Sequence, residues 1–277
     1  MTAAEERAKD SGFPMKLPRP LIWIAPLLAM LHVSAAEPAS MDLYLLVGQS
    51  NMAGRGKVTE ADRTPDPRIF VLNRENTWAN QGEPLHFDKA EAGVGLGFTF
   101  GKLAADARPG VTIGLIPCAV GGTPISRWKP GADLYEKALA RARIAVKSGR
   151  LKGILWHQGE SDSNNAVQAE GYAEKLAEIV RGFRRDLDAS AVPFVAGELG
   201  EFLYTRTGDK SPAARIVNAQ IDTLPKLVPH TAVARSTGLG HKGDQLHFSS
   251  EALKEFGKRY FEALQSINPP AKAGGKK

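Results

Sequence analysis

The sequence predicts an α/β fold, a three-layer α/β/α sandwich built on a mostly parallel sheet of five strands. Short apolar runs of strand length alternate along residues 41–267 with longer amphipathic stretches of helix length. Strands that are separated by helices pair in parallel, and the helices then cover both faces of the sheet. A single large α/β domain accommodates a chain of this length.

The expected strands are continuous apolar runs, which are typical of strands buried on both faces. They cover residues 43–47, 69–72, 111–116 and 194–196, with a further strand beginning at Ile154 and residues 231–234 as a sixth candidate. The expected helices cover residues 98–108, 134–147, 166–187, 213–227 and 251–267. Residues 166–187 give the clearest signal, because their large apolar side chains recur on one helical face.

The charge of the chain is concentrated at its ends. The net charge is +6, of which residues 1–36 contribute +1 and the three lysines of residues 268–277 contribute +3. The remaining body therefore has no strong electrostatic footprint for nucleic acid. Residues 268–277 are expected to form a disordered basic tail.

The N-terminal residues 1–36 are interpreted as an extension and a signal peptide. Lys16 and Arg19 precede an apolar run over 21–31, and small residues at 34–36 follow, which is the order of a secretory signal. The run is shorter than a comfortable membrane span. Met15 is the expected start, and the exported chain is expected in the periplasm or outside the cell, without stable membrane insertion after cleavage; an uncleaved anchor is the alternative.

The single cysteine, Cys118, allows no disulfide within the chain. It follows an apolar run and is expected to be a buried small hydrophobe. No cofactor is expected. A zinc site over Glu160 and Asp162 is poorly supported, because no second histidine lies near them. The oligomeric state is not determined by the sequence.

Four polar segments, three of which contain glycine, follow predicted strands or precede the last predicted helix, and open parallel sheets place their sites at that carboxyl edge. The segments are Gly48-Gln49-Ser50-Asn51, Gly121-Gly122-Thr123, His157-Gln158-Gly159-Glu160 and Asp244-Gln245-Leu246-His247. Acyl transfer requires a nucleophile, a base, an orienting acid and oxyanion donors. The four segments contain a candidate for each requirement.

Ser50, on a tight turn after the first strand, is the candidate nucleophile. His247 is the candidate base, and Asp244, three residues earlier, is the acid that orients the imidazole. The expected oxyanion donors are the amides of Ser50 and Gly122, with Gly121 as a rival to Gly122. The side-chain amide of Gln158 is the third expected donor.

These segments resemble the conserved blocks of the SGNH hydrolases. Within that superfamily, the pattern is similar to the branch of carbohydrate esterase family 6 and the sialate O-acetylesterases, and the likeness spans residues 41–265. The resemblance implies a flavodoxin-like fold over residues 37–267, removal of acetyl groups from sugars, and the roles given above for Ser50, Gln158, Asp244 and His247. Most members of the superfamily have asparagine in the third block, where this chain has Gln158.

The resemblance implies an acetylated carbohydrate as the partner, of the acetylxylan or the sialate type. The alternatives are a less selective esterase, lipase or thioesterase of the same fold, and a carbohydrate-binding protein without activity. Glu160 is expected to support the reacting groups by hydrogen bonding, and His157 to be structural. The candidate substrate contacts are Gln49, Asn51, Arg127, Trp128 and His241; a packed aromatic is the alternative for Trp128, and an ordinary surface position for His241.

Overall fold

The structure of the chain is a computed structural model that describes residues 40–206 and 211–267. The predicted signal peptide and basic tail lie outside these residues. In the described part, the strands are β1 (Met41–Gly48), β2 (Ile69–Leu72), β3 (Trp78–Ala79), β4 (Ile113–Pro117), β5 (Gly149–His157), β6 (Phe194–Gly197) and β7 (Thr231–Ala234). They form one sheet in the order β3-β2-β4-β1-β5-β6-β7, in which only β3 is antiparallel.

The sheet therefore confirms the predicted α/β class and mostly parallel pairing, but its seven strands correct the prediction of five. The sixth candidate, residues 231–234, pairs with β6 as a real edge strand. The seventh, β3, is two residues long and pairs only with β2. An apolar pattern cannot identify a strand of this length, because two residues carry no periodicity.

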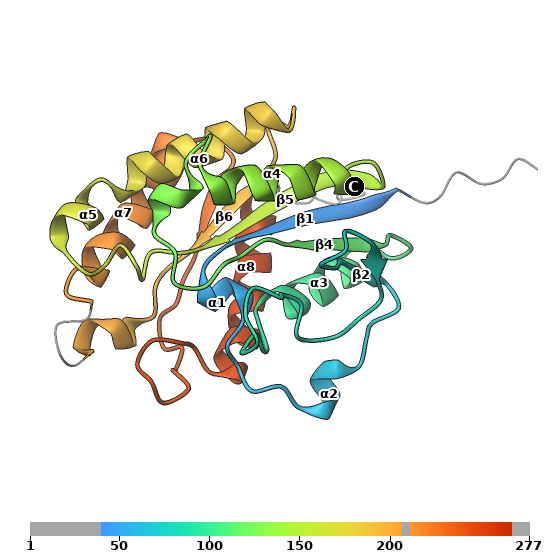
Figure 1. The fold of residues 1–277 in the computed structure, drawn as a ribbon, viewed down its shortest axis with the longest axis horizontal. Coiled ribbons are helices and arrows are strands. Elements are labelled where there is room, and N and C mark those ends of the chain that lie inside the picture. The colour runs from blue at the N-terminus through green and yellow to red at the C-terminus, as the bar shows by residue number, and fades with distance from the viewer. Residues whose placement is uncertain (1–39, 207–210, 268–277) are drawn as a thin grey trace, which may run out of the picture. The chain divides into compact units, whose positions relative to one another are not determined.

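The helices pack on both faces of the sheet, as Figure 1 shows. They are α1 (Ser50–Ala53), α2 (Glu60–Arg63), α3 (Gly97–Asp106), α4 (Asp133–Ala145), α5 (Ala166–Glu170), α6 (Tyr172–Asp186), α7 (Ala214–Leu227) and α8 (Ser250–Ile267), with 3-10 turns η1 (Ile125–Trp128) and η2 (Glu201–Thr205). The predicted helix over 166–187 is two helices, because the chain leaves helical geometry at Gly171.

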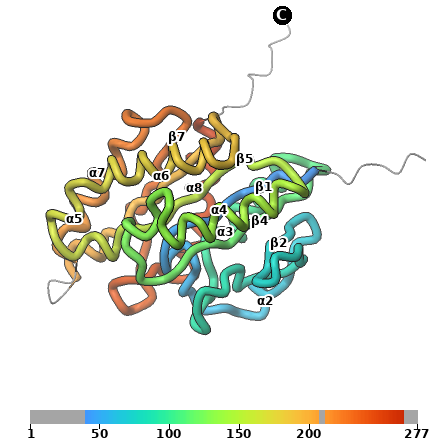
Figure 2. Tube along the Cα trace, turned by 45° about the horizontal axis from the view of Figure 1, so that its top comes forward, coloured from blue at the N-terminus to red at the C-terminus, as the bar shows by residue number. Residues whose placement is uncertain are grey.

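Strand β1 shows how the sheet separates two cores. Successive strand residues point to opposite faces. Leu43, Leu45 and Val47 join the core under α4, α6 and α7, whereas Tyr44 and Leu46 join the core under α3 and α8. Figures 1 and 2 both place α6 beside α7, which it contacts. Because both faces are covered, β1 is apolar at nearly every position until it reaches the site.

The central strands β1 and β5 end side by side at the same edge of the sheet. Gly48, the last residue of β1, has φ +133, and a Cβ at this position would lie 2.0 Å from the carbonyl oxygen of His157. A residue with a side chain would force the two strands apart there. Glycine thus lets the turn after β1 lie directly against the end of β5.

No helix of the described residues is long and apolar enough to cross a membrane.

Candidate active site

A pocket of about 500 Å³ lies at the carboxyl edge of the sheet, where the four polar segments meet. Ser50, buried at the start of α1, and His247, from the loop before α8, both line it. These two residues are 197 positions apart in the sequence. The fold therefore places the predicted nucleophile and the predicted base in one cavity.

The three candidate catalytic side chains form a continuous hydrogen-bonded line. His247 Nε2 lies 3.0 Å from Ser50 Oγ, and His247 Nδ1 lies 2.7 Å from Asp244 Oδ2. A carboxylate at Nδ1 holds the proton on that nitrogen and leaves Nε2 to accept the proton of a serine hydroxyl. The arrangement has the geometry of an activated serine nucleophile.

The loop itself holds Asp244 in place. Its Oδ1 accepts hydrogen bonds from the amides of Leu246 (2.9 Å) and His247 (2.8 Å). Burial raises the pKa of Asp244, but these bonds and the His247 side chain outweigh it and lower the pKa to about 2. The carboxylate therefore stays ionised at neutral and mildly acidic pH, as an orienting acid must.

The two glycines that were rivals for the oxyanion differ in what their amides bind. The Gly121 amide donates to Asp88 Oδ2 at 2.9 Å and is engaged. The Gly122 amide has no acceptor within the described part of the chain, and the residue is exposed on the wall of the pocket with φ +77. The Ser50 amide likewise has no acceptor among the described residues. Gly122 and Ser50 are therefore the amides that remain free to donate.

Gln158 does not occupy the position expected of an oxyanion donor. It is fully buried, does not line the pocket, and its Nε2 faces Asp162 Oδ2 (2.6 Å), the Thr123 carbonyl (2.9 Å) and Gln49 Oε1 (3.1 Å). The two hydrogens of the amide are already shared among three acceptors. The structure thus corrects the sequence prediction: Gln158 ties the segments together beneath the pocket.

Gln49, the hydrogen-bond partner of Gln158, lies on the pocket side of that pair. It lines the pocket, and its Oε1 accepts from Gln158 Nε2 and from the Ser161 amide at 3.3 Å. Among the described residues, Gln49 Nε2 has no acceptor. Gln49 is therefore the one of the five candidate substrate contacts that lies on the pocket wall.

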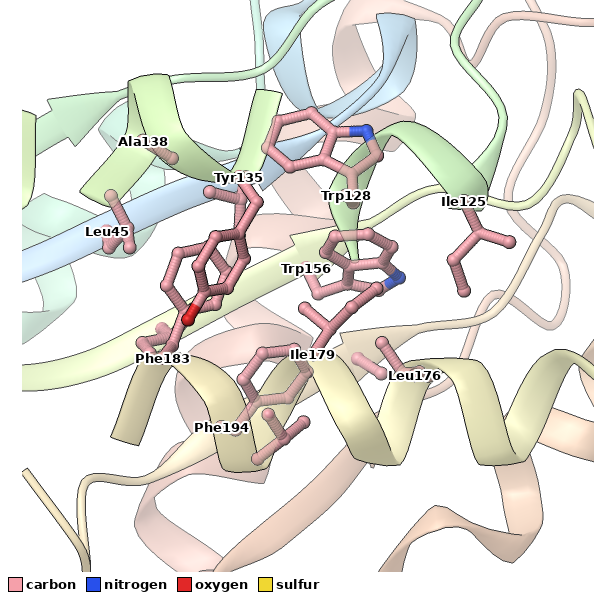
Figure 3. Packing of buried hydrophobic residues seen from close by; sticks show 14 of the residues in the cluster. Leu45, Ile125, Trp128, Tyr135, Ala138, Trp156, Leu176, Ile179, Phe183 and Phe194 are labelled. Atoms are coloured by element: carbon pink, nitrogen blue, oxygen red, sulfur yellow. The ribbon is translucent and has the colours of Figure 1, made fainter. Parts of the chain in front are cut away.

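Trp128 is corrected from a candidate substrate contact to a core residue. It is fully buried and packs edge-on against Trp156 with ring centroids 5.6 Å apart, as Figure 3 shows. Its Nε1 donates to Thr123 Oγ1 at 3.2 Å, which satisfies the polar end of the indole. No face of the ring is left for a sugar.

The other three candidate contacts are also corrected, because none lines the pocket. Arg127 is exposed and forms an ion pair with Asp133. His241 lies in the loop of residues 241–249, which carries Asp244 and His247 and is called the catalytic loop here; its Nδ1 accepts from the amides of Gly243 (2.9 Å) and Gln245 (3.2 Å). Asn51 is buried and binds the same loop from below.

Glu160 lines the pocket but is almost fully buried, and it accepts a hydrogen bond from Asn51; its expected support of the reacting groups stays a prediction. Its Oε1 accepts from Asn51 Nδ2 at 2.5 Å and lies 3.4 Å from His157 Nε2. His157 is fully buried, as expected of a structural residue. No three His, Cys, Asp or Glu side chains in residues 40–206 and 211–267 are grouped as metal ligands would be.

Arg55 and Asp88 form a buried ion pair that the sequence did not indicate. The two side chains lie 2.6 Å apart and are 3% and 1% exposed. Burial raises the pKa of Asp88, but the hydrogen bond from Arg55 and the Gly121 amide outweigh it, and the net shift is downward. No local pattern marks this pair, because 33 residues separate its members.

Three exposed or partly exposed basic side chains on the pocket wall were also missed: Lys89, Arg206 and Lys242. Lys242 lies 3.8 Å from Asp244, and Lys89 lies 4.0 Å from Glu91. They come from three separate loops, so their convergence depends on the fold.

The fold and the site define the class of protein: an ester hydrolase of the SGNH type. Comparison with known proteins gives the family. Residues 40–266 match the sequence model of the family described as carbohydrate esterase, sialic acid-specific acetylesterase. The chain belongs to this family and is a hydrolase of the acetylesterase type.

Individual relatives agree with this assignment. A "probable carbohydrate esterase" of Arabidopsis thaliana is 30% identical over 244 residues, which cover 81% of this chain and 90% of that protein. Its crystal structure has a TM-score of 0.74, with 28% identity over 83% of this chain and 99% of the other.

More distant structures share the fold alone. NanS has a TM-score of 0.63 and 18% identity, covering 83% of this chain and 98% of its own. A carbohydrate acetylesterase from Xanthomonas citri has a TM-score of 0.62 and 20% identity, covering 82% of this chain and 56% of its own.

Proposed function

We propose that this protein removes acetyl groups from an acetylated carbohydrate, of the acetylxylan or sialate type, through an acyl-enzyme formed on Ser50. The observation that carries the proposal is the line of hydrogen bonds from Asp244 through His247 to Ser50 on the wall of an open pocket. The family of the chain supplies the acetyl ester and the carbohydrate.

The first half-reaction transfers the acetyl group to the enzyme. Ser50 Oγ attacks the acetyl carbonyl carbon while His247 Nε2 takes the hydroxyl proton, and Asp244 stabilises the resulting imidazolium. The tetrahedral intermediate collapses when the sugar oxygen leaves, and His247 returns the proton to it. The second half-reaction repeats these steps with water as the nucleophile and releases acetate.

The oxyanion is held by donors that no protein group engages. The amides of Ser50 and Gly122 meet this condition, and Gln49 Nε2 is the side-chain donor that accompanies them. Donors of this kind act by being fixed in advance where negative charge develops. In this proposal Gln158 contributes indirectly. It donates a hydrogen bond to Gln49 Oε1, which leaves Gln49 Nε2 available to the oxyanion.

The composition of the pocket supports a hydrophilic substrate. Its wall carries amide, hydroxyl, carboxylate and basic side chains, and Leu246 is its single large apolar residue among the described positions. Such a surface offers hydrogen bonds to sugar hydroxyls and little apolar area to a long acyl chain.

We also propose that the chain is exported, because its first 36 residues have the order of a signal peptide.

The experiment that tests this function compares wild type with Ser50→Ala. Wild type should hydrolyse p-nitrophenyl acetate and release acetate from acetylated xylan or O-acetylated sialic acid. Ser50→Ala should fold normally and lose at least about 10³-fold in kcat, because triad members act as one unit. Near-wild-type turnover by Ser50→Ala would remove the proposal, and absence of turnover in wild type would favour a binding protein.

A further inference from the structure

Asn51, the residue after Ser50, is hydrogen-bonded to the catalytic loop on both sides of His247. Its Oδ1 accepts from the Phe248 amide at 3.1 Å, and its Nδ2 donates to the Leu246 carbonyl at 3.2 Å. Leu246 and Phe248 are the two neighbours of His247 in the chain. Asn51 is 1% exposed, so both bonds are shielded from water. The Asn51 side chain, on the turn that carries Ser50, therefore fixes the backbone on both sides of His247 relative to Ser50.

Asn51 is itself anchored from the opposite side by a buried carboxylate. Its Nδ2 also donates to Glu160 Oε1 at 2.5 Å. Burial raises the pKa of Glu160, but the hydrogen bond and charge of His157 and the hydrogen bond from Asn51 outweigh it, and the net shift is downward. Glu160 Oε2 has no partner among the described residues. The side-chain contacts that offset the burial of the Glu160 carboxylate are therefore those made at Oε1.

The second contact at Oε1 is His157, which is held from its other side by Tyr260. Tyr260 Oη donates its single hydrogen to the Trp156 carbonyl at 2.7 Å. The hydroxyl must then accept from His157 Nδ1, which lies 3.1 Å away. His157 Nε2 faces Glu160 Oε1 at 3.4 Å and has no hydrogen-bond partner among the described residues. Glu160 and His157 thus form a close, buried pair next to Asn51.

We infer that Asn51 is a positioning residue that aligns His247 with Ser50, and that the buried pair of Glu160 and His157 fixes Asn51 in its working orientation. The inference rests on the proposed function, because it presupposes that His247 is the base for Ser50. It assigns a task to three buried polar residues that the catalytic steps leave without one. Both side chains of the pair are almost fully buried in a close-packed interior, so they have little freedom to move and hold Asn51 in place.

The chain offers a matched control in Asn218. This asparagine is also buried and also makes three hydrogen bonds, with the Leu199 amide (2.7 Å), the Leu199 carbonyl (2.9 Å) and Tyr204 Oη (2.7 Å). It joins α7 to the loop after β6 and does not line the catalytic pocket. A purely structural role predicts the same consequences for the loss of either asparagine.

The experiment compares Asn51→Ala with Asn218→Ala. Thermal unfolding measures stability, and kcat and KM for p-nitrophenyl acetate are measured per folded molecule. Both variants should melt at lower temperature, but only Asn51→Ala should lose about 10²-fold in kcat, the effect of a roughly 1 Å misplacement of a reacting group. KM should stay within about twofold, because Asn51 does not touch the substrate. Equal kcat values in the two folded variants would overturn the inference.

A double-mutant cycle with Glu160→Gln tests the anchor. If Glu160 acts through Asn51, Glu160→Gln should lower kcat in the wild-type background and have no further effect in Asn51→Ala. Independent, multiplying effects on kcat would show that Glu160 does not act through Asn51. The lesser variants Asn51→Ser and Asn218→Ser apply the same comparison if either alanine variant fails to fold.

Ser50→Ala separates this inference from the function on which it rests. An active Ser50→Ala would remove the proposed function and the inference together. An inactive Ser50→Ala, combined with Asn51→Ala and Asn218→Ala of equal kcat, would leave the function intact and remove the positioning role alone.

Discussion

The turns after β1 and β5 each begin with a glutamine, and the two glutamines have different surroundings. Both follow central parallel strands, and their glutamines, Gln49 and Gln158, lie 3.1 Å apart in a hydrogen bond. Gln49 lines the pocket with a free Nε2, whereas Gln158 is fully buried among three acceptors. A polar residue at the end of a strand is therefore only a candidate for the site. The hydrogen-bonding demand of its neighbours decides whether it faces the substrate.

The carboxylates of the site show the same contrast. The Asp244 side chain is 37% exposed. Its Oδ1 accepts from the loop amides, and its Oδ2 lies within hydrogen-bond distance of His247 Nδ1. Asp162 is buried, and its Oδ2 accepts from Gln158 Nε2 and the Ile125 amide. Burial raises the pKa of Asp162, whereas backbone amides lower that of Asp244. In the proposed function, Asp244 takes part in the reaction, whereas Asp162 holds the surrounding segments together.

The largest expected effect comes from exchanging these carboxylates for amides. Asp244→Asn should keep the fold and lower kcat by about 10⁴-fold, because the amide favours the wrong imidazole tautomer. Asp162→Asn should lower the melting temperature and leave kcat per folded molecule close to wild type. Steady-state kinetics and thermal unfolding of both variants provide the measurement. A crippled Asp162→Asn beside a mild Asp244→Asn would reverse the contrast.

The next effect distinguishes the two glutamines. Gln49→Leu removes a proposed oxyanion donor and should lower kcat by about 10²–10³-fold with KM little changed. Gln158→Leu leaves the buried Thr123 carbonyl without its donor and removes one of the two donors to Asp162 Oδ2, which should cost about 1–3 kcal/mol of unfolding free energy. Its kcat per folded molecule should fall less than that of Gln49→Leu.

The two leucine variants are matched, because each keeps the volume of the side chain and removes its hydrogen bonds. Denaturant unfolding and kcat on p-nitrophenyl acetate give both quantities for each. If Gln158→Leu loses more kcat than Gln49→Leu at equal folded fraction, Gln158 is the donor that the sequence predicts.

The smallest effect on catalysis is expected at Trp128. Trp128→Phe removes the hydrogen bond to Thr123 and part of the packing against Trp156, so the free energy of unfolding should fall by about 1–3 kcal/mol. KM for an acetylated sugar should not change, because the ring is fully buried. A raised KM at unchanged stability would show that Trp128 contacts the substrate after all.

The fold class and the meeting of Ser50, His247 and Asp244 in one site could be predicted from the sequence. Burial of a sheet on both faces produces continuous apolar runs such as residues 43–47, which are visible without coordinates. Asp244 and His247 lie three residues apart, so a single loop brings them together. Information of this kind is local, and the structure leaves it nearly unchanged.

The environment of each polar side chain could not be predicted, because its partners are distant in sequence. Asp88 engages the amide of Gly121 from 33 positions away and leaves Gly122 as the free donor. Asn51 looked like a substrate contact until its partners near His247, almost 200 positions away, became known. The sequence by itself determined which four polar segments reach the carboxyl edge of the sheet. Only the tertiary structure decided which of them keep an unengaged polar group facing the pocket, because buried groups take whatever hydrogen-bond partners the fold brings to them.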